Sequence, residues 1–221
     1  MKDMNGSEWV ECNSKIFWGK ISTRDHLVQI YENDTVVLDS LEGFVCSGFK
    51  AGESVIIIAT TEHLKALEER LRINGFDINA LCSTDQYIPL NAEETLSKFM
   101  INGWPNKDLF MESVKEVVTR ARGKKRRPVR AYGEMVAILW AQGHSGATIR
   151  LENLWNKFSE TEAFCLFCAY PKISFTQDIN TSISNICATH TKVISGEVGP
   201  ATEIFYKGSQ QKIPIFRPLL T

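Results

Sequence analysis

Polar side chains with potential chemistry lie at the ends of three predicted strands. These strands are 55–60, 129–132 and 164–170. Because the carboxyl ends of parallel strands meet at one edge of a sheet, a ligand crevice at that edge would collect the residues at the ends of the three strands. The sequence therefore predicts a ligand-binding site formed by Thr60, Thr61, His63, Tyr132, Glu134 and Tyr170.

Glu134 is the leading candidate among these residues, because a carboxylate at a strand end can be partly desolvated and hydrogen-bonded. A first-turn glutamate that stabilises a helix dipole is an equally good interpretation. His63 could be a pH switch or a ligand contact, although a lone helical histidine is more often a surface or hydrogen-bonded residue. Tyr132 and Tyr170 could line a ligand with an aromatic wall, or could pack in the core.

The helix after the first apolar run begins without a phosphate-binding loop. A Walker-type loop, G-x-x-x-x-G-K-[ST], wraps phosphates with glycine-flexed backbone N–H groups and one lysine. Residues 59–62 read Ala-Thr-Thr-Glu, and the first lysine, Lys65, already lies inside the expected helix. The threonine hydroxyls could still meet a polar ligand group at the helix start, but we expect Thr61 simply to cap the helix. The pattern predicts a binding protein and not an ATPase.

The cysteines do not predict a metal centre. Cys165 and Cys168 have an odd separation within a strand, which directs their sulfur atoms to opposite faces of the sheet. Cys187 and His190 could supply two ligands, but no second pair of similar spacing accompanies them. We therefore expect free thiols, no metal and no cofactor. We also expect no functional role for Cys165 and Cys168.

Composition excludes several classes of partner. The formal net charge is −1 and 43% of the residues are hydrophobic, which is ordinary for a globular protein. The basic cluster at 123–128 lacks the basic face or aromatic platform of a nucleic-acid reader, so nucleic acid is an unlikely partner. No apolar run is long enough to cross a membrane, and the N-terminus has no signal-peptide core. These features predict a cytoplasmic protein without a membrane partner.

Strands and helices alternate along the chain, which indicates an α/β fold with a mostly parallel sheet covered by helices on both faces. Strands are expected at 26–31, 55–60, 86–90, 129–132, 164–170 and 192–194. Helices are expected at 36–49, 61–74, 92–102, 107–122, 133–141, 145–160 and 177–188. The runs at 55–59 and 164–170 are continuously apolar and belong at the sheet centre.

Several segments together resemble one family of domains. They are 44–63, Glu94-Thr-Leu-Ser-Lys-Phe-Met, Val129-Arg-Ala-Tyr-Gly-Glu-Met-Val, Leu151-Glu-Asn-Leu-Trp-Asn and Leu166-Phe-Cys-Ala-Tyr-Pro. In this order and spacing the chain is similar to the MEDS domain, a sensory domain named for methanogens, methylotrophs and a dichloromethane-responsive regulator. The resemblance implies a RecA/KaiC-like fold whose phosphate loop is lost, and a small organic ligand.

The resemblance also implies an organisation and a role. Residues 1–23 would be an N-terminal extension, 24–197 the sensory domain, and 198–221 a tail that docks on the domain or on another copy of the chain. The domain would not be an enzyme and would signal by contact with a separate protein, such as a histidine kinase or a regulator. Two alternatives stay open. One is a divergent NTP-binding or NTP-hydrolysing protein, in which Glu134 activates water and Thr60 or Thr61 holds Mg²⁺. The other is a purely structural interaction module.

Overall fold

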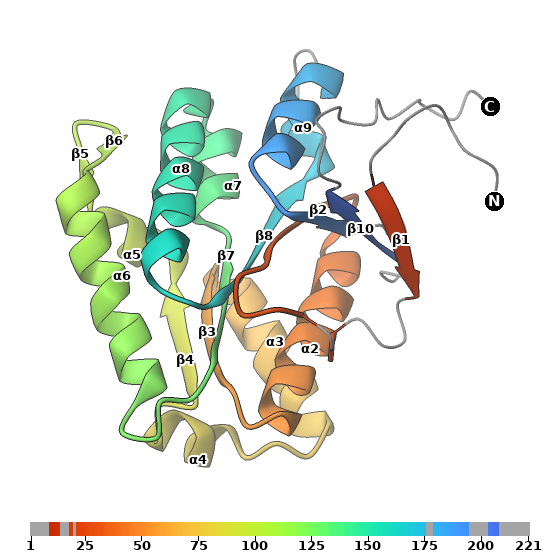
Figure 1. The fold of residues 1–221 in the computed structure, drawn as a ribbon, viewed down its shortest axis with the longest axis vertical. Helices are drawn as coiled ribbons and strands as arrows, with labels where there is room; N and C mark the ends of the chain where they lie inside the picture. Colours follow the sequence, from red (N-terminus) through yellow and green to blue (C-terminus); the bar gives the residue numbers. More distant parts are fainter. Residues whose placement is uncertain (1–8, 14–17, 20, 176–178, 195–202, 208–221) are drawn as a thin grey trace.

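The computed structural model describes residues 9–13, 18–19, 21–175, 179–194 and 203–207 (Figure 1). Eight strands form one sheet in the order β1-β10-β9-β2-β8-β7-β3-β4. Their bounds are β1 Trp9–Asn13, β2 His26–Tyr31, β3 Ser54–Ala59, β4 Tyr87–Asn91, β7 Val129–Gly133, β8 Cys165–Pro171, β9 Lys192–Ile194 and β10 Glu203–Lys207. The strands from β9 to β4 are parallel, whereas β10 and β1 add to the β9 edge as antiparallel strands.

Helices cover both faces of this sheet (Figure 1). One face carries α2 Asp34–Lys50, α3 Thr61–Ile73 and α4 Ile78–Ser83. The other carries α5 Ala92–Ser97, α6 Lys107–Arg122, α7 Met135–Ala141, α8 Ser145–Thr161 and α9 Ile179–Ala188, with a short 3₁₀ turn, η1 Lys172–Ser174. Each face of the sheet has its own hydrophobic core. The architecture confirms the expected α/β fold with a parallel sheet between two helical layers.

The sequence explains where most helices begin. A polar residue directly before each of five helices accepts a hydrogen bond from a backbone N–H of the first turn, which satisfies a donor that the helix itself cannot pair. These caps are Asn33, Thr60, Asp77, Asn91 and Asn106. The cap of α3 is therefore Thr60, and the expectation that Thr61 caps this helix was wrong. The side chain of Thr61 instead accepts a hydrogen bond from Asn91 Nδ2 at 3.0 Å.

The expected helix at 92–102 is shorter in the structure. It ends at Ser97, and the next residues form a small antiparallel hairpin of β5 Met100–Ile101 and β6 Trp104–Pro105. Asn102 and Gly103 connect the two strands with φ angles of 50° and 79°. Positive φ at both positions is typical of a tight hairpin turn, and Asn-Gly is the favoured sequence for it. Turn chemistry thus overrides the helical pattern here.

The crossovers create a reversal in chain order within the sheet. From β3 the chain moves outward to β4 at the edge, and it then returns to β7 on the other side of β3. The carboxyl ends of β3 and β7 therefore lie side by side at a point from which the chain leaves in opposite directions. In open parallel sheets, this is where ligand crevices form.

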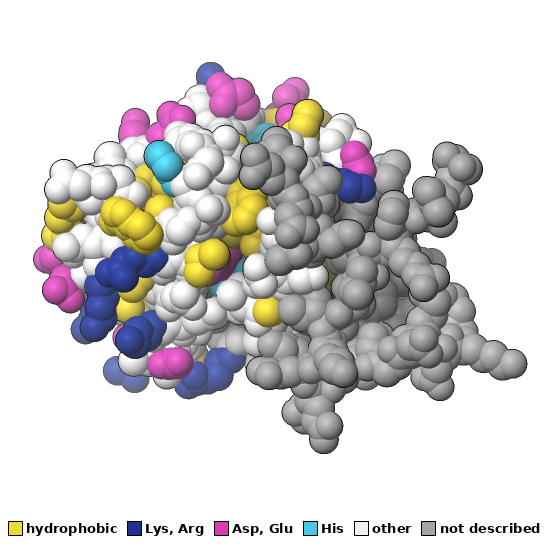
Figure 2. Space-filling view, turned by 90° about the horizontal axis from the view of Figure 1, so that it is seen from above, with side chains coloured by type: hydrophobic (Ala, Val, Ile, Leu, Met, Phe, Trp, Pro, Cys, Tyr) yellow, Lys and Arg dark blue, Asp and Glu magenta, His cyan; other side chains and the backbone are white. Residues whose placement is uncertain are grey.

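Figure 2 shows the molecule from above, and side chains of both charge signs share the described part of this surface. Lys and Arg gather along the left side, while hydrophobic side chains are scattered between them. Charge therefore does not mark one binding face in this view. Among the described residues, no helix combines the length and the apolar character needed to span a membrane.

Candidate functional site

Glu134 lies directly after β7, at the point where the chain order reverses, and its carboxylate is held from three directions. The backbone N–H of Thr60 donates to Oε2 at 2.8 Å, while the Tyr132 hydroxyl donates to Oε1 at 2.9 Å. His63 Nδ1 lies 2.5 Å from the same Oε1. The Glu134 backbone N–H donates to Ile58 O at 2.9 Å, which fixes the residue against β3. Only 3% of Glu134 is exposed.

This carboxylate occupies the first turn of α3. Backbone N–H groups at a helix start are unpaired and carry a partial positive charge, so they bind anions. In this protein an internal anion, the Glu134 side chain, already accepts the N–H of the capping residue Thr60. At this helix start, the N–H groups of Thr60 and His63 are thus paired with side chains of the protein itself. A phosphate group at this place would have to displace a buried, hydrogen-bonded carboxylate of the same charge sign.

His63 connects the Glu134 network to a second helix. Its Nδ1 faces Glu134, and its Nε2 lies 3.5 Å from Oδ1 of Asp34, in the first turn of α2. Burial lowers the pKa of His63, but the hydrogen bond to Glu134 and the negative charges of Glu134 and Asp34 outweigh it, so the pKa is raised above 6.5. The pKa of Tyr132 is raised well above 10.0, chiefly by burial, which keeps its hydroxyl protonated as a donor.

The raised pKa of His63 predicts a specific pH dependence. Its contribution to stability is complete below the unfolded-state pKa of about 6.5, and it is lost as the pH rises through the higher pKa of the folded state. We expect His63→Gln to lack the part of the decline in unfolding free energy that wild type shows from about pH 6.5 upward. Urea unfolding at several pH values measures this, and the difference between the two proteins cancels the groups they share. His144→Gln, at an exposed histidine, should keep the wild-type slope, and equal slopes in all three proteins would contradict the assignment.

The structure brings together four of the six predicted site residues. Thr60, His63, Tyr132 and Glu134 contact one another. Thr61 is adjacent in sequence, but it is exposed and bonded to Asn91. Tyr170 belongs to the opposite face of the sheet from Tyr132 and does not reach Glu134.

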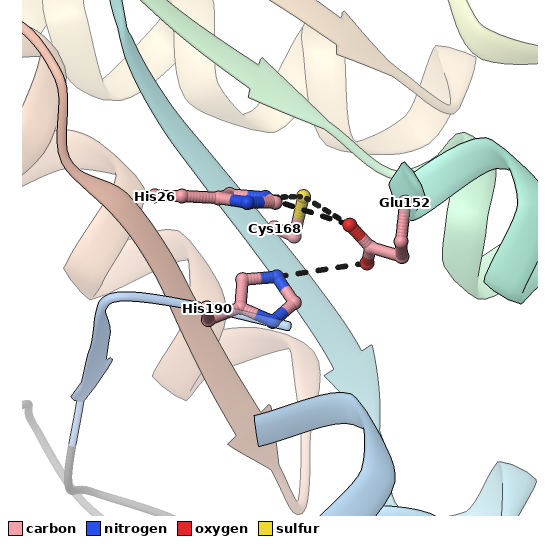
Figure 3. Close-up of side chains that lie close together, drawn as sticks. All are labelled: His26, Glu152, Cys168 and His190. Atoms are coloured by element: carbon pink, nitrogen blue, oxygen red, sulfur yellow. Dashed lines mark hydrogen bonds and ion pairs between the residues drawn. The ribbon is translucent and has the colours of Figure 1, made fainter. Parts of the chain in front are cut away.

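Tyr170 instead donates a hydrogen bond to Glu152, within a polar cluster that the sequence reasoning missed. Figure 3 shows its central side chains, His26, Glu152, Cys168 and His190, pointing toward one another from β2, α8, β8 and the segment before β9. Burial lowers the pKa of His26 to about 4, although the Asn156 hydrogen bond opposes this shift. Burial also raises the pKa of Glu152 to about 7, with the Tyr170 hydrogen bond acting in the other direction. Burial therefore shifts the pKa of each group in the direction that favours its neutral form.

One signal in the sequence could have revealed this cluster. Glu152 lies at a core-facing position of α8, between Thr148 and Trp155, where an apolar residue would be expected. A buried carboxylate requires partners. Strand spacing correctly placed Cys165 and Cys168 on opposite faces, but it could not show that two histidines from distant segments lie beside Cys168. Cys46, Cys82, Cys165, Cys168 and Cys187 are all free thiols.

Comparison with solved structures identifies the fold. A Pyrococcus horikoshii OT3 protein, solved in a structural project, matches with a TM-score of 0.56 and 14% identity over 95% of this chain and 100% of its own. A KaiC-like protein from the same hyperthermophilic archaeon matches with a TM-score of 0.55 and 10% identity over 87% of this chain and 84% of its own. At such identities the likeness concerns the fold alone, which is RecA/KaiC-like.

Comparison by sequence gives the family. No curated protein sequence matches the chain. The family model for the MEthanogen/methylotroph, DcmR Sensory domain matches residues 25–191, from the residue before β2 to the residue before β9 and across both polar networks described above. The chain therefore belongs to the MEDS family of sensory domains.

Proposed function

We propose that this protein binds a small organic ligand at the carboxyl ends of β3 and β7 and passes its state to an output protein by contact. The partner would be a signalling protein such as a histidine kinase or a transcriptional regulator. Membership of a sensory family supports the class of function. The observation that carries the proposed site is the buried Glu134 carboxylate, bound to the start of α3 and to His63.

This network suits a sensor because it connects separate elements through few bonds. Glu134 follows β7, His63 lies in the first turn of α3, and Asp34 lies in the first turn of α2. A ligand with a hydroxyl or amine group could replace one of these contacts and favour a different arrangement of the helix starts. A ligand shifts such an equilibrium by its difference in affinity for the two arrangements. The exposed ends of α2 and α3 could then present the change to a partner.

The same geometry argues against nucleotide chemistry. The turn from β2 to α2 reads Glu32-Asn33-Asp34, and the turn from β3 to α3 reads Thr60-Thr61. Neither contains a glycine or a lysine, and an acidic side chain lies at the start of each helix, Asp34 at α2 and Glu134 at α3. Both features disfavour phosphate. We therefore propose that the phosphate loop is lost and that the domain senses without catalysis.

A thermal-shift assay with small one-carbon compounds that carry a hydroxyl or amine group tests the proposal, with methanol and methylamine as probes. A ligand at a hundred times its dissociation constant adds about 2.7 kcal/mol, which for a chain of this size corresponds to a rise in Tm of roughly 5–10 °C. We expect at least one probe to raise the Tm of wild type and of Glu112→Gln, at an exposed position on α6. Glu134→Gln should lose the shift. A shift that persists in Glu134→Gln would place the ligand elsewhere.

The thermal-shift assay, together with a phosphate-release assay, tests the nucleotide alternative. We expect Mg-ATP at millimolar concentration to leave the Tm unchanged and to release no phosphate, because neither helix start offers a glycine-rich loop. Phosphate release by wild type that is abolished in Glu134→Ala would instead support a divergent NTPase, with Glu134 as the group that activates water.

A further inference from the structure

Four potential metal ligands meet between the sheet and the helical layer that contains α8 and α9. His26 is 4% exposed, Glu152 and His190 are each 1% exposed, and Cys168 is fully buried. His26 Nε2 lies 3.4 Å from Cys168 Sγ and 3.5 Å from Glu152 Oε2. Cys168 Sγ lies 4.0 Å from Glu152 Oε2, and His190 Nε2 lies 3.6 Å from Glu152 Oε1. One ligand atom from each residue falls within 4.8 Å of all the others.

These distances resemble the edges of a tetrahedral site. Zinc bonds of about 2.0–2.1 Å to nitrogen or oxygen and about 2.3 Å to sulfur place neighbouring ligand atoms roughly 3.3–3.8 Å apart in a tetrahedron. The three pairs formed by His26 Nε2, Cys168 Sγ and Glu152 Oε2 already lie between 3.4 and 4.0 Å. His190 Nε2 lies 3.6 Å from the other carboxylate oxygen, Oε1. Small rotations of the side chains would close the wider separations.

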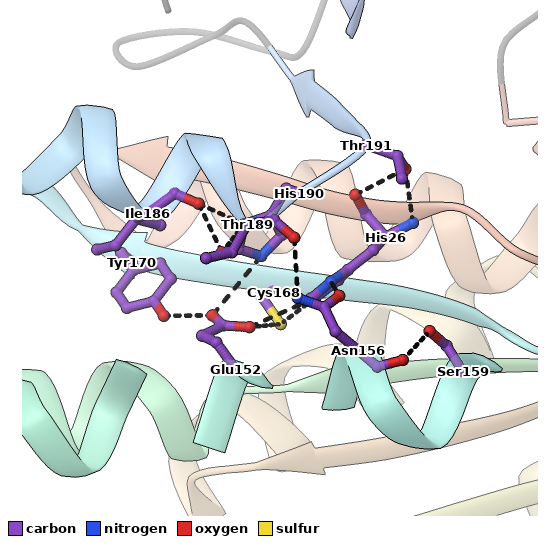
Figure 4. Close-up of polar contacts among 10 residues, drawn as sticks. All are labelled: His26, Glu152, Asn156, Ser159, Cys168, Tyr170, Ile186, Thr189, His190 and Thr191. Atoms are coloured by element: carbon purple, nitrogen blue, oxygen red, sulfur yellow. Dashed lines mark hydrogen bonds and ion pairs between the residues drawn. The ribbon is translucent and has the colours of Figure 1, made fainter. Parts of the chain in front are cut away.

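The surrounding hydrogen bonds orient both imidazole rings for metal binding (Figure 4). His26 Nδ1 lies 2.8 Å from Asn156 Oδ1, and the Asn156 amide is fixed because its Nδ2 donates to Thr189 O at 3.1 Å. An amide oxygen only accepts, so the ring proton of His26 is on Nδ1 and the Nε2 lone pair faces the cluster. His190 repeats the arrangement, with Nδ1 at 2.7 Å from the carbonyl oxygen of Ile186. Metal-bound histidines are generally held in this way.

The charges also fit a divalent cation. A thiolate from Cys168 and a carboxylate from Glu152 carry two negative charges, and the two histidines are neutral ligands, so a divalent metal makes the buried site neutral. The hydroxyl of Tyr170 donates to Glu152, which further orients the carboxylate. Mixed nitrogen, sulfur and oxygen ligands in a tetrahedral arrangement favour zinc among common metals.

We propose that His26, Glu152, Cys168 and His190 form a closed Zn²⁺ site that joins β2, β8, α8 and the segment between α9 and β9. This assignment departs from the expectation of no metal that the cysteine spacing alone suggested. With four protein ligands and no exposed face, the ion holds the helical layer against the sheet and does not activate water. The site lies on the opposite face of the sheet from Tyr132 and its network, so it stands independently of the proposed ligand site.

Metal analysis of the full chain tests the assignment first. We expect the protein purified from zinc-supplemented medium to contain one equivalent of Zn²⁺, as measured by inductively coupled plasma mass spectrometry. After removal of zinc by a chelator, Co²⁺ should restore one equivalent and give intense tetrahedral d–d bands with a thiolate-to-cobalt charge-transfer band. A protein that binds no stoichiometric metal, or that is purified from this medium with iron or copper in place of zinc, would overturn the assignment.

Two cysteines on the same strand provide a matched pair of variants. Cys168→Ser should remove the charge-transfer band, whereas Cys165→Ser should keep it, because Cys165 is equally buried but lies on the other face of β8. The reverse result would contradict the proposed ligand set.

A variant outside the ligand set covers the case in which Cys168→Ser does not fold. Asn156→Ala removes the bond that orients His26 and leaves all four ligands in place. We expect its zinc affinity to fall about 10–100-fold while the charge-transfer band of the cobalt form is retained. Unchanged affinity would show that Asn156 does not orient a metal ligand, against the proposal.

Discussion

Replacing Glu134 with alanine is expected to lower the free energy of unfolding by about 3–5 kcal/mol, the range for removing one partner of a buried ion pair. The change leaves the Thr60 N–H, the Tyr132 hydroxyl and the His63 ring without their common acceptor. A buried donor that loses its partner carries a desolvation cost. Urea unfolding with an unchanged m-value measures the loss.

Two comparisons give this result its meaning. Glu134→Gln keeps the shape and one acceptor oxygen but loses the charge, so we expect a smaller loss than with alanine. Glu112→Ala, at an exposed position on α6, should change stability by less than about 0.5 kcal/mol. If Glu134→Ala were no more destabilising than Glu112→Ala, the network would not hold α3 to β7, and the sensor proposal would lose its structural basis.

The parallel core of the fold was predictable because its sequence signals are local. All six expected strands exist, and the helices at 61–74, 107–122 and 145–160 lie within two residues of the observed elements. Continuous apolar runs such as Val55–Ala59 require cover on both faces, and the structure buries them completely. The antiparallel edge strands β1 and β10 were not expected. Their pairing depends on partners far away in the chain, and no local pattern encodes it.

Most of the candidate site was predictable from the sequence, but the part that depends on the register between neighbouring strands was not. The end of a strand and the residue types that follow it are visible in the sequence, which is why Thr60, His63, Tyr132 and Glu134 were found together. The face on which a residue lies relative to a neighbouring strand depends on register. Tyr132 pairs with Phe167, so alternation along β8 turns Tyr170 toward the other core. A shift of one residue in that pairing would have reversed the outcome.

The buried cluster was not predictable from spacing for a related reason. Its four central residues are separated in sequence by 126, 16 and 22 residues (152 − 26, 168 − 152 and 190 − 168). No short motif contains two of them. Only the packing of β2 beside β8, with α8 and the segment before β9 facing them, brings the side chains together. The ligand separations that identify a zinc site from sequence apply when ligands lie on one turn or hairpin, and this cluster has no such arrangement.

Arg130 connects β7 to α2, on the same face of the sheet as the Glu134 network. Tyr132 and Glu134 form the strand-end network, whereas Arg130, on the same face of β7, points toward α2. Its guanidinium forms an ion pair with Glu53 and donates to Phe44 O at 3.2 Å, with Cζ 5.4 Å from the centre of the Phe44 ring. A Cβ atom at Gly48 would lie 3.1 Å from Arg130 Cδ, so α2 can approach the arginine closely only because this position has no side chain.

We expect Arg130→Met to lower the free energy of unfolding by about 3–5 kcal/mol, because it leaves the mostly buried Glu53 carboxylate without its cation and two backbone carbonyls without their donor. Arg130 NH1 also donates to Trp18 O at 2.9 Å, so the variant should loosen the segment that precedes β2, and hydrogen exchange of the backbone measures that effect separately.

The matched control is Arg72→Met, whose partner Glu68 lies four residues earlier on an exposed helix face. Exposed pairs of this kind contribute about 0.3–0.5 kcal/mol, so the control should lose little. The double variant Arg130→Met with Glu53→Met removes both charges and should recover part of the stability, because the uncompensated carboxylate is then absent. A double variant that is as unstable as the two single losses added together would show that the arginine acts through packing alone and that the ion pair contributes nothing to the position of α2.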